Sequence, residues 1–225
     1  MTMIKSINLR KTYQNTDEFI YALFDCNLEI SDGEFVIISG AKKSGKTTLL
    51  HLLGGFEKPS GGLIYINNQN ISKYDEDELA ILRRNEIGFM LHNDSLIPEL
   101  TVHENIIMPL ILAQKKYDEN YYVELADQLH ISGILNQYPK ILTTNQLRSV
   151  AYARALINNP NIILMDDPLN DLYHDSDSES LDNLLHIISK YHKTLIMATN
   201  NPEFGSYANH IIRLRDGVVV EDRLT

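Results

Sequence analysis

Apolar and polar residues alternate along the chain in a way that predicts a mixture of strands and helices. Residues 3–38 carry apolar side chains in short alternating pieces with a turn at 31–33, which is typical of paired strands. A hairpin is predicted for residues 211–220, with Asp216 and Gly217 at its turn. Continuous apolar runs, which favour buried parallel strands, lie at 87–91, 162–165 and 194–199.

Helical spacing appears between these strands. Residues 75–84 have acids in the first turn and arginines at the end, as the helix dipole favours. One apolar face is predicted for a helix that carries Leu181, Leu184, Leu185 and Ile188. Residues 95–135 are helical in composition and are interpreted as an inserted helical subdomain. Alternating strands and helices predict an open α/β sheet with its ligand at the strand ends.

Residues 40–48 fit the phosphate-binding pattern G-x-x-x-x-G-K-[ST] between a predicted strand and a predicted helix. Glycines let backbone N–H groups approach phosphate oxygens, while Lys46 reaches the outer phosphates and the Thr47 hydroxyl can hold Mg²⁺. The alternative to a phosphate-binding loop is an ordinary Gly/Lys turn. Lys42 and Lys43 either add positive charge around the phosphates or are solvated side chains, as loop lysines of an acidic protein more often are. The candidate nucleotide-binding residues are Gly40, Ala41, Lys42, Lys43, Ser44, Gly45, Lys46, Thr47 and Thr48.

Composition narrows the class of protein. The 225 residues are 44% hydrophobic, enough for one large or two small domains. A formal charge of -10 argues against a nucleic-acid binder, because the phosphate backbone of a nucleic acid favours a basic protein surface. A single cysteine, Cys26, excludes an intrachain disulfide and suits a reducing compartment. We therefore expect a cytoplasmic protein without a signal core or a membrane span.

Three further positions have a candidate role that the pattern alone leaves open. Acidic residues are frequent after the strand at 162–165, and most are interpreted as solvated surface, but Asp166 and Asp167 follow the strand directly. A divalent cation would let a phosphate ligand lie near them. Tyr13 is either a packing residue or an aromatic ring that stacks on a nucleobase.

The order of these segments resembles the nucleotide-binding subunit of an ABC transporter, within the branch for lipoprotein release and macrolide or antimicrobial-peptide export. Phrases that support the resemblance beyond the phosphate-binding loop lie at residues 96–105, 138–139, 151–156 and 213–217. It implies an α/β P-loop NTPase of ABC type, with a mixed central sheet, an N-terminal antiparallel β part and an inserted helical subdomain. Residues 1–225 then form a single nucleotide-binding domain, with a core of 1–92 and 147–225 and a helical subdomain of about 93–146.

The resemblance also implies roles for single residues. Tyr13 becomes the adenine-stacking aromatic, Asp166 the aspartate that holds Mg²⁺, and Asp167 occupies the position of the catalytic base. The implied cofactors are ATP and Mg²⁺. The implied partners are an integral-membrane permease, on which the helical subdomain docks at the inner face of the membrane, and possibly a second nucleotide-binding subunit. We expect the isolated chain to be monomeric.

Several positions depart from the family pattern. His92 stands in place of a glutamine, Asp167 in place of a glutamate, and Asn200 in place of a histidine. Thr144 and Asn145 replace the two glycines of the family's signature motif, LSGGQ. Tyr173 stands where the family's D-loop ends in an aspartate. Two hypotheses stay open: a subunit that binds Mg-ATP with weak or absent hydrolysis, or a slow transport ATPase that uses Asp167 as its base.

Overall fold

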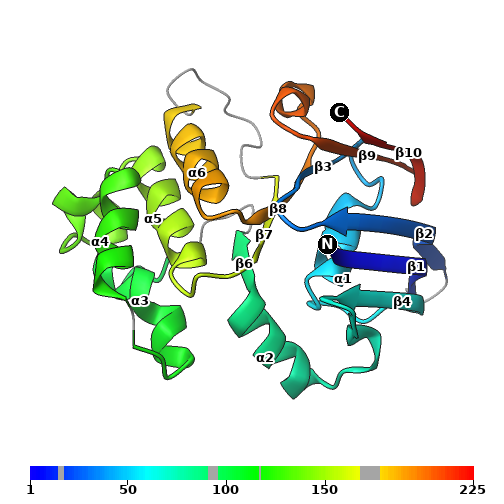
Figure 1. The fold of residues 1–225 in the computed structure, drawn as a ribbon, viewed down its shortest axis with the longest axis horizontal. Helices are drawn as coiled ribbons and strands as arrows, with labels where there is room; N and C mark the ends of the chain where they lie inside the picture. The colour runs from blue at the N-terminus through cyan, green and yellow to red at the C-terminus, as the bar shows by residue number, and fades with distance from the viewer. Residues whose placement is uncertain (15–17, 91–95, 117, 168–177) are drawn as a thin grey trace. The chain divides into compact units, whose positions relative to one another are not determined.

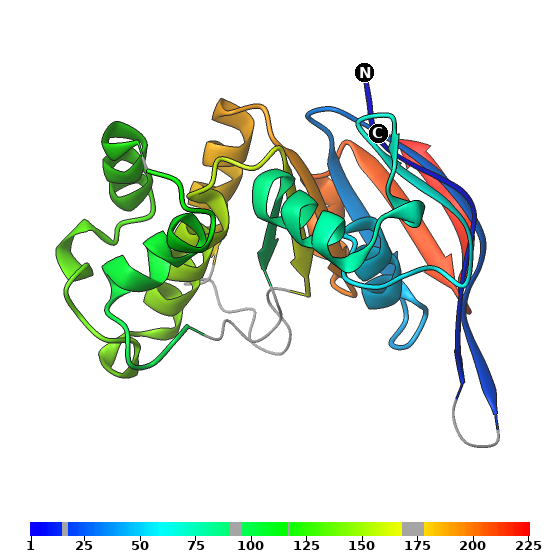
Figure 2. The ribbon, with the colours of Figure 1, turned by 90° about the horizontal axis from the view of Figure 1, so that it is seen from below.

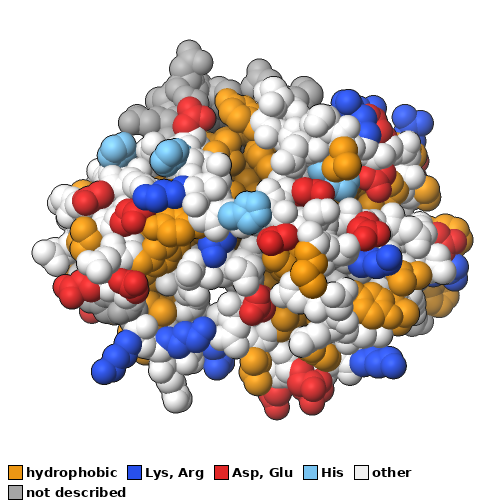
Figure 3. Space-filling view, viewed as in Figure 1, with side chains coloured by type: hydrophobic (Ala, Val, Ile, Leu, Met, Phe, Trp, Pro, Cys, Tyr) orange, Lys and Arg blue, Asp and Glu red, His pale blue; other side chains and the backbone are white. Residues whose placement is uncertain are grey.

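The computed structural model describes residues 1–14, 18–90, 96–116, 118–167 and 178–225 (Figure 1). Its residues divide into two compact units. The first contains Met1–Arg83, Leu164–Asp167 and Thr194–Thr225, and the second contains Arg84–Ile163 and Pro168–Lys193. On the face seen in Figure 3, acidic and basic side chains are interspersed over the described surface.

The first unit contains a four-stranded antiparallel sheet of order β2-β1-β4-β5. Its strands are β1 (Thr2–Gln14), β2 (Phe19–Ser31), β4 (Gly61–Ile66) and β5 (Gln69–Asn70). In β2, Cys26, Leu28 and Ile30 are buried and alternate with exposed residues, as the period of two requires. The β1–β2 hairpin continues past the end of β4 (Figure 2). Residues 11–14 of β1 therefore pair only with β2.

A six-stranded sheet has the order β10-β9-β3-β8-β7-β6. Its strand β3 runs parallel to β8 and β9, and β10 is antiparallel to its neighbour β9. Every residue of β8 is buried, which explains its unbroken apolar sequence. The strands are β3 (Phe35–Gly40), β6 (Ile87–Met90), β7 (Ile162–Asp166), β8 (Thr194–Thr199), β9 (His210–Arg215) and β10 (Val218–Leu224).

Helix α1 (Lys46–Leu53) follows β3 and buries four leucines in the core of the first unit. Asp75 directly precedes helix α2 (Glu76–Glu86), and its side chain and backbone exchange hydrogen bonds with Glu78 at 2.9 Å each. This reciprocal pair satisfies two backbone donors that the helix start leaves open. Two short 3-10 helices, η1 (Ile71–Lys73) and η5 (Pro202–Ser206), complete the first unit.

Helices dominate the second unit. They are α3 (Val102–Leu112), α4 (Glu119–Gln128), α5 (Thr144–Leu156) and α6 (Ser178–Lys190), with short 3-10 helices η2 (Ser132–Ile134) and η3 (Pro139–Ile141). Buried Asn105 stabilises the start of α3, because its amide bonds the backbone of Ile97 and Leu100. In the part of the chain that the structure describes, no helix has the length and apolar character needed to span a bilayer.

Candidate functional site

The P-loop, residues 40–48, connects the end of β3 to the start of α1. Gly40 and Gly45 have φ angles of 152° and 102°, which side chains rarely tolerate. A Cβ atom at Gly40 would lie 2.4 Å from the Leu214 carbonyl oxygen, and one at Gly45 would lie 2.5 Å from that of Ala22. These two positions require glycine, because the loop backbone lies directly against β2 and β9.

The ammonium of Lys46 lies inside this loop. Its Nζ donates hydrogen bonds of 2.9 Å to the carbonyl oxygens of Gly40 and Ala41. Burial lowers the pKa of Lys46, while the negative charges of Asp167 and Asp166 oppose that shift. The loop also contains Ser44, whose buried hydroxyl has no hydrogen-bond partner among the described residues. A half-buried ammonium and an unsatisfied buried hydroxyl at a loop of this shape fit a phosphate group.

Thr47 and Asp166 meet although 119 positions separate them in the sequence. The Thr47 hydroxyl donates to Asp166 Oδ1 at 3.0 Å. Thr47 is in the first turn of α1 and Asp166 is the last residue of β7, so the sheet and the helix bring the two oxygens together. A hydroxyl and a carboxylate are oxygen ligands of the kind that Mg²⁺ prefers. The pair therefore fits a magnesium ion held between protein and phosphate.

Asp167 lies one residue beyond β7 and has a left-handed backbone with φ of 45°. Its backbone N–H donates to the Ala198 carbonyl at 2.8 Å, and its carboxylate accepts from the Thr199 hydroxyl at 3.4 Å. Asn200 directly follows the same strand, β8. The first unit therefore contains the phosphate loop, both aspartates and Asn200 at the carboxyl ends of parallel strands, where ligands of open α/β sheets bind.

Tyr13 lines a cavity of about 500 Å³ together with the second half of the P-loop. The Tyr13 hydroxyl donates to Glu57 at 2.7 Å and lies 3.4 Å from the hydroxyl of Thr48. No sequence motif marks Glu57, so it is not among the residues predicted for the site. The full lining is Tyr13, Ile20, Tyr21, Ala22, Lys43, Gly45, Lys46, Thr47, Thr48, Asp216 and Gly217.

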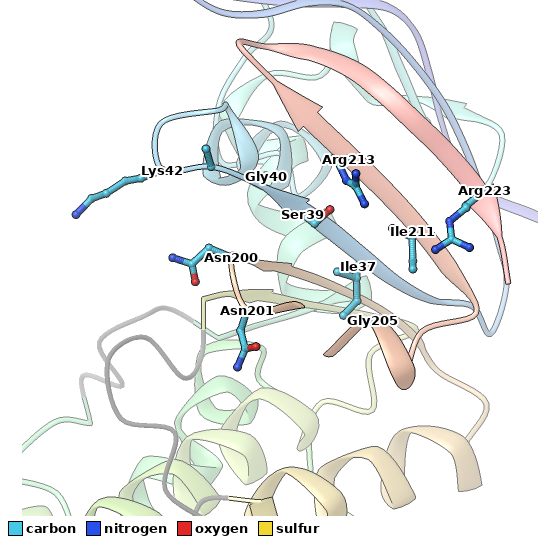
Figure 4. Close-up of a pocket in the computed structure, with 11 residues that line it drawn as sticks. Ile37, Ser39, Gly40, Lys42, Asn200, Asn201, Gly205, Ile211, Arg213 and Arg223 are labelled. Atoms are coloured by element: carbon cyan, nitrogen blue, oxygen red, sulfur yellow. The ribbon is translucent and has the colours of Figure 1, made fainter. Parts of the chain in front are cut away.

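The first half of the P-loop lines a second cavity, of about 850 Å³ (Figure 4). Asn200 and Asn201 enter it from the loop after β8, while Ser39 comes from β3. The side chain of Lys42 extends away from the other lining residues. Arg213 of β9 and Arg223 of β10 also line this cavity, and both form ion pairs with Glu221.

The other altered positions lie elsewhere or outside the described residues. Thr143 caps α5, since its hydroxyl accepts from the Gln146 N–H at 3.3 Å and the Gln146 side chain accepts from the Thr143 N–H at 2.9 Å. Thr144 and Asn145 are thus in the first turn of a helix of the second unit. His92 and Tyr173 lie outside the described residues.

Comparison with known proteins identifies the family. The profile of the ABC transporter family matches residues 23–170. The macrolide export ATP-binding/permease protein MacB of Bdellovibrio bacteriovorus is 36% identical over 98% of this chain, which spans about a third (34%) of the MacB length. The bacitracin export ATP-binding protein BceA of Halalkalibacterium halodurans is 33% identical over 97% of this chain and 87% of its own.

A solved structure covers almost the whole chain. The dimeric ATP-binding cassette MJ0796, described in a post-hydrolysis state bound to ADP and Pi, matches with a TM-score of 0.88 and 36% identity over 99% of this chain and 98% of its own. The protein of that name from Methanocaldococcus jannaschii is 37% identical over 96% of this chain. The predicted α/β fold of ABC type and the resemblance to the macrolide and antimicrobial-peptide export branch are confirmed. This chain belongs to the ATP-binding domains of ABC transporters.

Proposed function

We propose that this chain binds Mg-ATP as the ATP-binding subunit of an ABC transporter complex and hydrolyses it weakly or not at all. The contact between Thr47 and Asp166 supports magnesium-dependent binding most directly, because these two side-chain oxygens lie together beside the P-loop and are of the kind that Mg²⁺ prefers. Tyr13 would stack on the adenine in the adjoining cavity, and residues 40–48 would hold the phosphates.

Weak hydrolysis follows from the residues at the catalytic positions. Asp167 is one methylene shorter than glutamate, which withdraws its carboxylate by more than about 1 Å, and a 1 Å misplacement can cost about 100-fold in rate. Its carboxylate already accepts a hydrogen bond from Thr199. Asn200 cannot supply the proton or positive charge that a histidine would. Removal of a general acid or base typically lowers the catalytic rate by about 10²- to 10⁴-fold. The two losses do not multiply, because the effects of residues that act together are not additive.

The partner would be an integral-membrane permease, by which the chain would be held at the inner face of the cell membrane. The names of MacB and BceA support export of a macrolide or a peptide as the class of process. In this arrangement residues 1–225 act as one nucleotide-binding domain, with residues 93–146 as the surface for the permease. A second nucleotide-binding subunit would complete the complex, and the isolated chain would be monomeric. In this complex ATP binding orders the subunit or its partner.

A slow transport ATPase is the second candidate. The negative charges of Asp167 and Asp166 favour the protonated form of Lys46 and oppose the lowering of its pKa by burial. A carboxylate is therefore available close to the group expected to hold the outer phosphates. In this reading Asp167 is a weak general base that activates water.

Binding and turnover separate the two candidates. Mg-ATP affinity and steady-state phosphate release are measured for the purified chain, alone and with any co-purifying membrane subunit, beside Asp167→Glu and Asn200→His. We expect ATP binding without turnover, and a gain of turnover in the restored variants. Turnover of the unmodified complex at about 1 s⁻¹ or more is an ordinary enzymatic rate and would favour the ATPase. Failure to bind ATP at millimolar concentration, or binding insensitive to Lys46→Ala, would exclude both.

A further inference from the structure

A network of side chains surrounds the hydroxyl of Tyr13. The hydroxyl donates to Glu57 Oε2 at 2.7 Å, and the same oxygen lies 3.0 Å from Lys11 Nζ. Lys11 also donates to the Lys58 carbonyl oxygen at 2.9 Å. Since the Tyr13 proton points to Glu57, the Thr48 hydroxyl, 3.4 Å away, is left as a donor to the Tyr13 oxygen. Glu57 is therefore the central acceptor of this network.

The network connects two parts of the first unit. Tyr13 lies where β1 pairs only with β2, so a single neighbouring strand supports its backbone. Glu57 lies just after α1, where the Phe56 N–H bonds the His51 carbonyl oxygen at 2.8 Å. The Glu57 carboxylate is also 3.5 Å from the His51 ring. Glu57 thus fixes the end of a hairpin to the helix that begins with the phosphate-binding lysine.

Lys11 gives the tyrosine ring two unequal faces. Its Nζ lies over the Tyr13 ring, 5.0 Å from the centroid, so one face is already in a cation–π contact. The other face is the one left for a nucleobase in the cavity that Tyr13 lines. The side chains of Lys11 and Glu57 are only 15% and 26% exposed, and their opposite charges compensate each other close to the expected phosphate site.

The protonation states agree with this geometry. Burial opposes the charged form of Glu57, but the hydrogen bonds from Tyr13 and Lys11 outweigh it and lower the pKa of the carboxyl. Burial and the bond to Glu57 raise the pKa of Tyr13, so its hydroxyl keeps its proton. An ionised acceptor and a neutral donor form a charge-assisted hydrogen bond with a single direction.

We propose that Glu57 is a positioning residue for the nucleobase: it holds the Tyr13 ring with one face against Lys11 and the other toward the base, at a fixed place relative to the P-loop. This role rests on the proposed function, in which Tyr13 stacks on the adenine of ATP. Glu57 itself touches neither the base nor the phosphates in this arrangement. Its removal therefore weakens the stacking contact and leaves the phosphate contacts intact.

The test compares a ligand with a base and a ligand without one. Equilibrium binding of Mg-ATP and of magnesium tripolyphosphate is measured for the unmodified chain, Glu57→Ala, Glu57→Gln, Tyr13→Ala and the Glu57→Ala/Tyr13→Ala double variant. Glu29→Ala is the matched control, because Glu29 is an exposed carboxylate of β2 that bonds Thr2 and Lys5.

We expect Glu57→Ala to weaken Mg-ATP binding about 3- to 30-fold, the size of one lost hydrogen bond to a charged group that is partly exposed. Glu57→Ala should leave the affinity for tripolyphosphate unchanged. Glu29→Ala should leave the affinities for both Mg-ATP and tripolyphosphate unchanged. Glu57→Gln should restore part of the loss, since its amide oxygen accepts from Tyr13. The loss should disappear in the Tyr13→Ala background, because no ring is left to position. If Glu57→Ala does not fold, Tyr13→Phe, which removes only the hydroxyl, carries the same expectation.

Three results would overturn the role of Glu57 while leaving ATP binding intact. These are unchanged ATP affinity in Glu57→Ala, an equal loss for ATP and tripolyphosphate, or a loss that adds in full to that of Tyr13→Ala. Failure of the unmodified chain to bind ATP would instead refute the proposed function, and with it the role of Glu57.

Discussion

His210 links three segments of the first unit and should make its stability depend on pH. Its Nδ1 lies 2.7 Å from Glu34 Oε2 and its Nε2 lies 2.6 Å from Asp222 Oδ1. Carboxylate oxygens only accept hydrogen bonds when ionised, so both ring nitrogens must donate, and only the imidazolium does so. Burial favours the neutral ring, but the bonds to Asp222 and Glu34 outweigh it and raise the pKa of His210.

The exposures of the partners set the size of the effect. The His210 side chain is 4% exposed and that of Glu34 15%, so this bond should contribute in the range of about 1.5–3 kcal/mol found for charged groups. Asp222 is 40% exposed, and its share is about 1 kcal/mol or less because water screens it. His210→Gln should therefore lower the free energy of unfolding by about 3 kcal/mol at low pH. For a chain of this size that loss lowers Tm by roughly 6–12 °C.

The direction of the pH dependence follows from the raised pKa. The folded state holds the His210 proton more tightly than the unfolded state, so the stabilisation is fully present below the unfolded pKa of about 6.5. It is lost as the pH rises through the folded pKa. Urea unfolding of the unmodified chain and of His210→Gln, from about pH 6 to pH 9, should show a stability gap that narrows as the pH rises.

A matched control is His186→Gln, since His186 is an exposed residue of α6. It should leave the free energy of unfolding and its pH dependence unchanged. A gap between the unmodified chain and His210→Gln that stays constant or widens with pH would refute the reasoning. A titration of the His210 ring followed by NMR would locate the folded pKa directly.

Three further predictions concern the site. Lys43→Gly should raise the free energy of unfolding, measured in urea, by up to about 1 kcal/mol, because Lys43 has a left-handed φ of 67°, yet it should weaken ATP binding. The control Gln114→Gly, at a φ of 53°, should leave ATP affinity unchanged. Equal ATP affinities in the two variants would contradict a role for the Lys43 charge. Gly45→Ala should lower the free energy of unfolding by about 2–4 kcal/mol, seen as a lower Tm, because the added Cβ would lie too close to the Ala22 carbonyl oxygen. An unchanged Tm would show that the loop backbone shifts to accommodate the Cβ. Asp166→Asn should weaken ATP binding about 10- to 100-fold with Mg²⁺ but not in EDTA, and an equal loss in both would argue against a metal role.

Much of the fold follows from patterns that burial imposes on the sequence. The runs at 162–165 and 194–199 are strands because both faces are covered. Helix α5 gave no such signal, since residues all around it are buried and its apolar positions show no single face. In α6, Ile187 is buried whereas the predicted Leu185 is only half-buried, because the buried face is turned slightly from the predicted one.

The residues of the site likewise differ in whether the sequence predicts them. Residues 40–48 form a local motif, and a local motif can be found by spacing alone. The contact between Thr47 and Asp166 joins distant segments, so no local spacing predicts it, although each residue is predicted separately as a candidate near Mg²⁺. Glu57 and Lys11 contact Tyr13 through a hydrogen bond and a cation–π contact that no sequence spacing encodes. Sequence patterns report periodic burial and local loops, while networks of single side chains depend on the packed structure.

The position of β3 in its sheet has a consequence for the order of events on the ribosome. The strand that leads into the P-loop is flanked by β8 and β9, which are synthesised more than a hundred residues later. At about 5–20 residues per second, roughly 8–30 s pass before either neighbour is synthesised. During that time β3 has exposed edges and the P-loop lacks the Leu214 backbone that it lies against. The packed form of the P-loop therefore forms only after β8 and β9 have been synthesised.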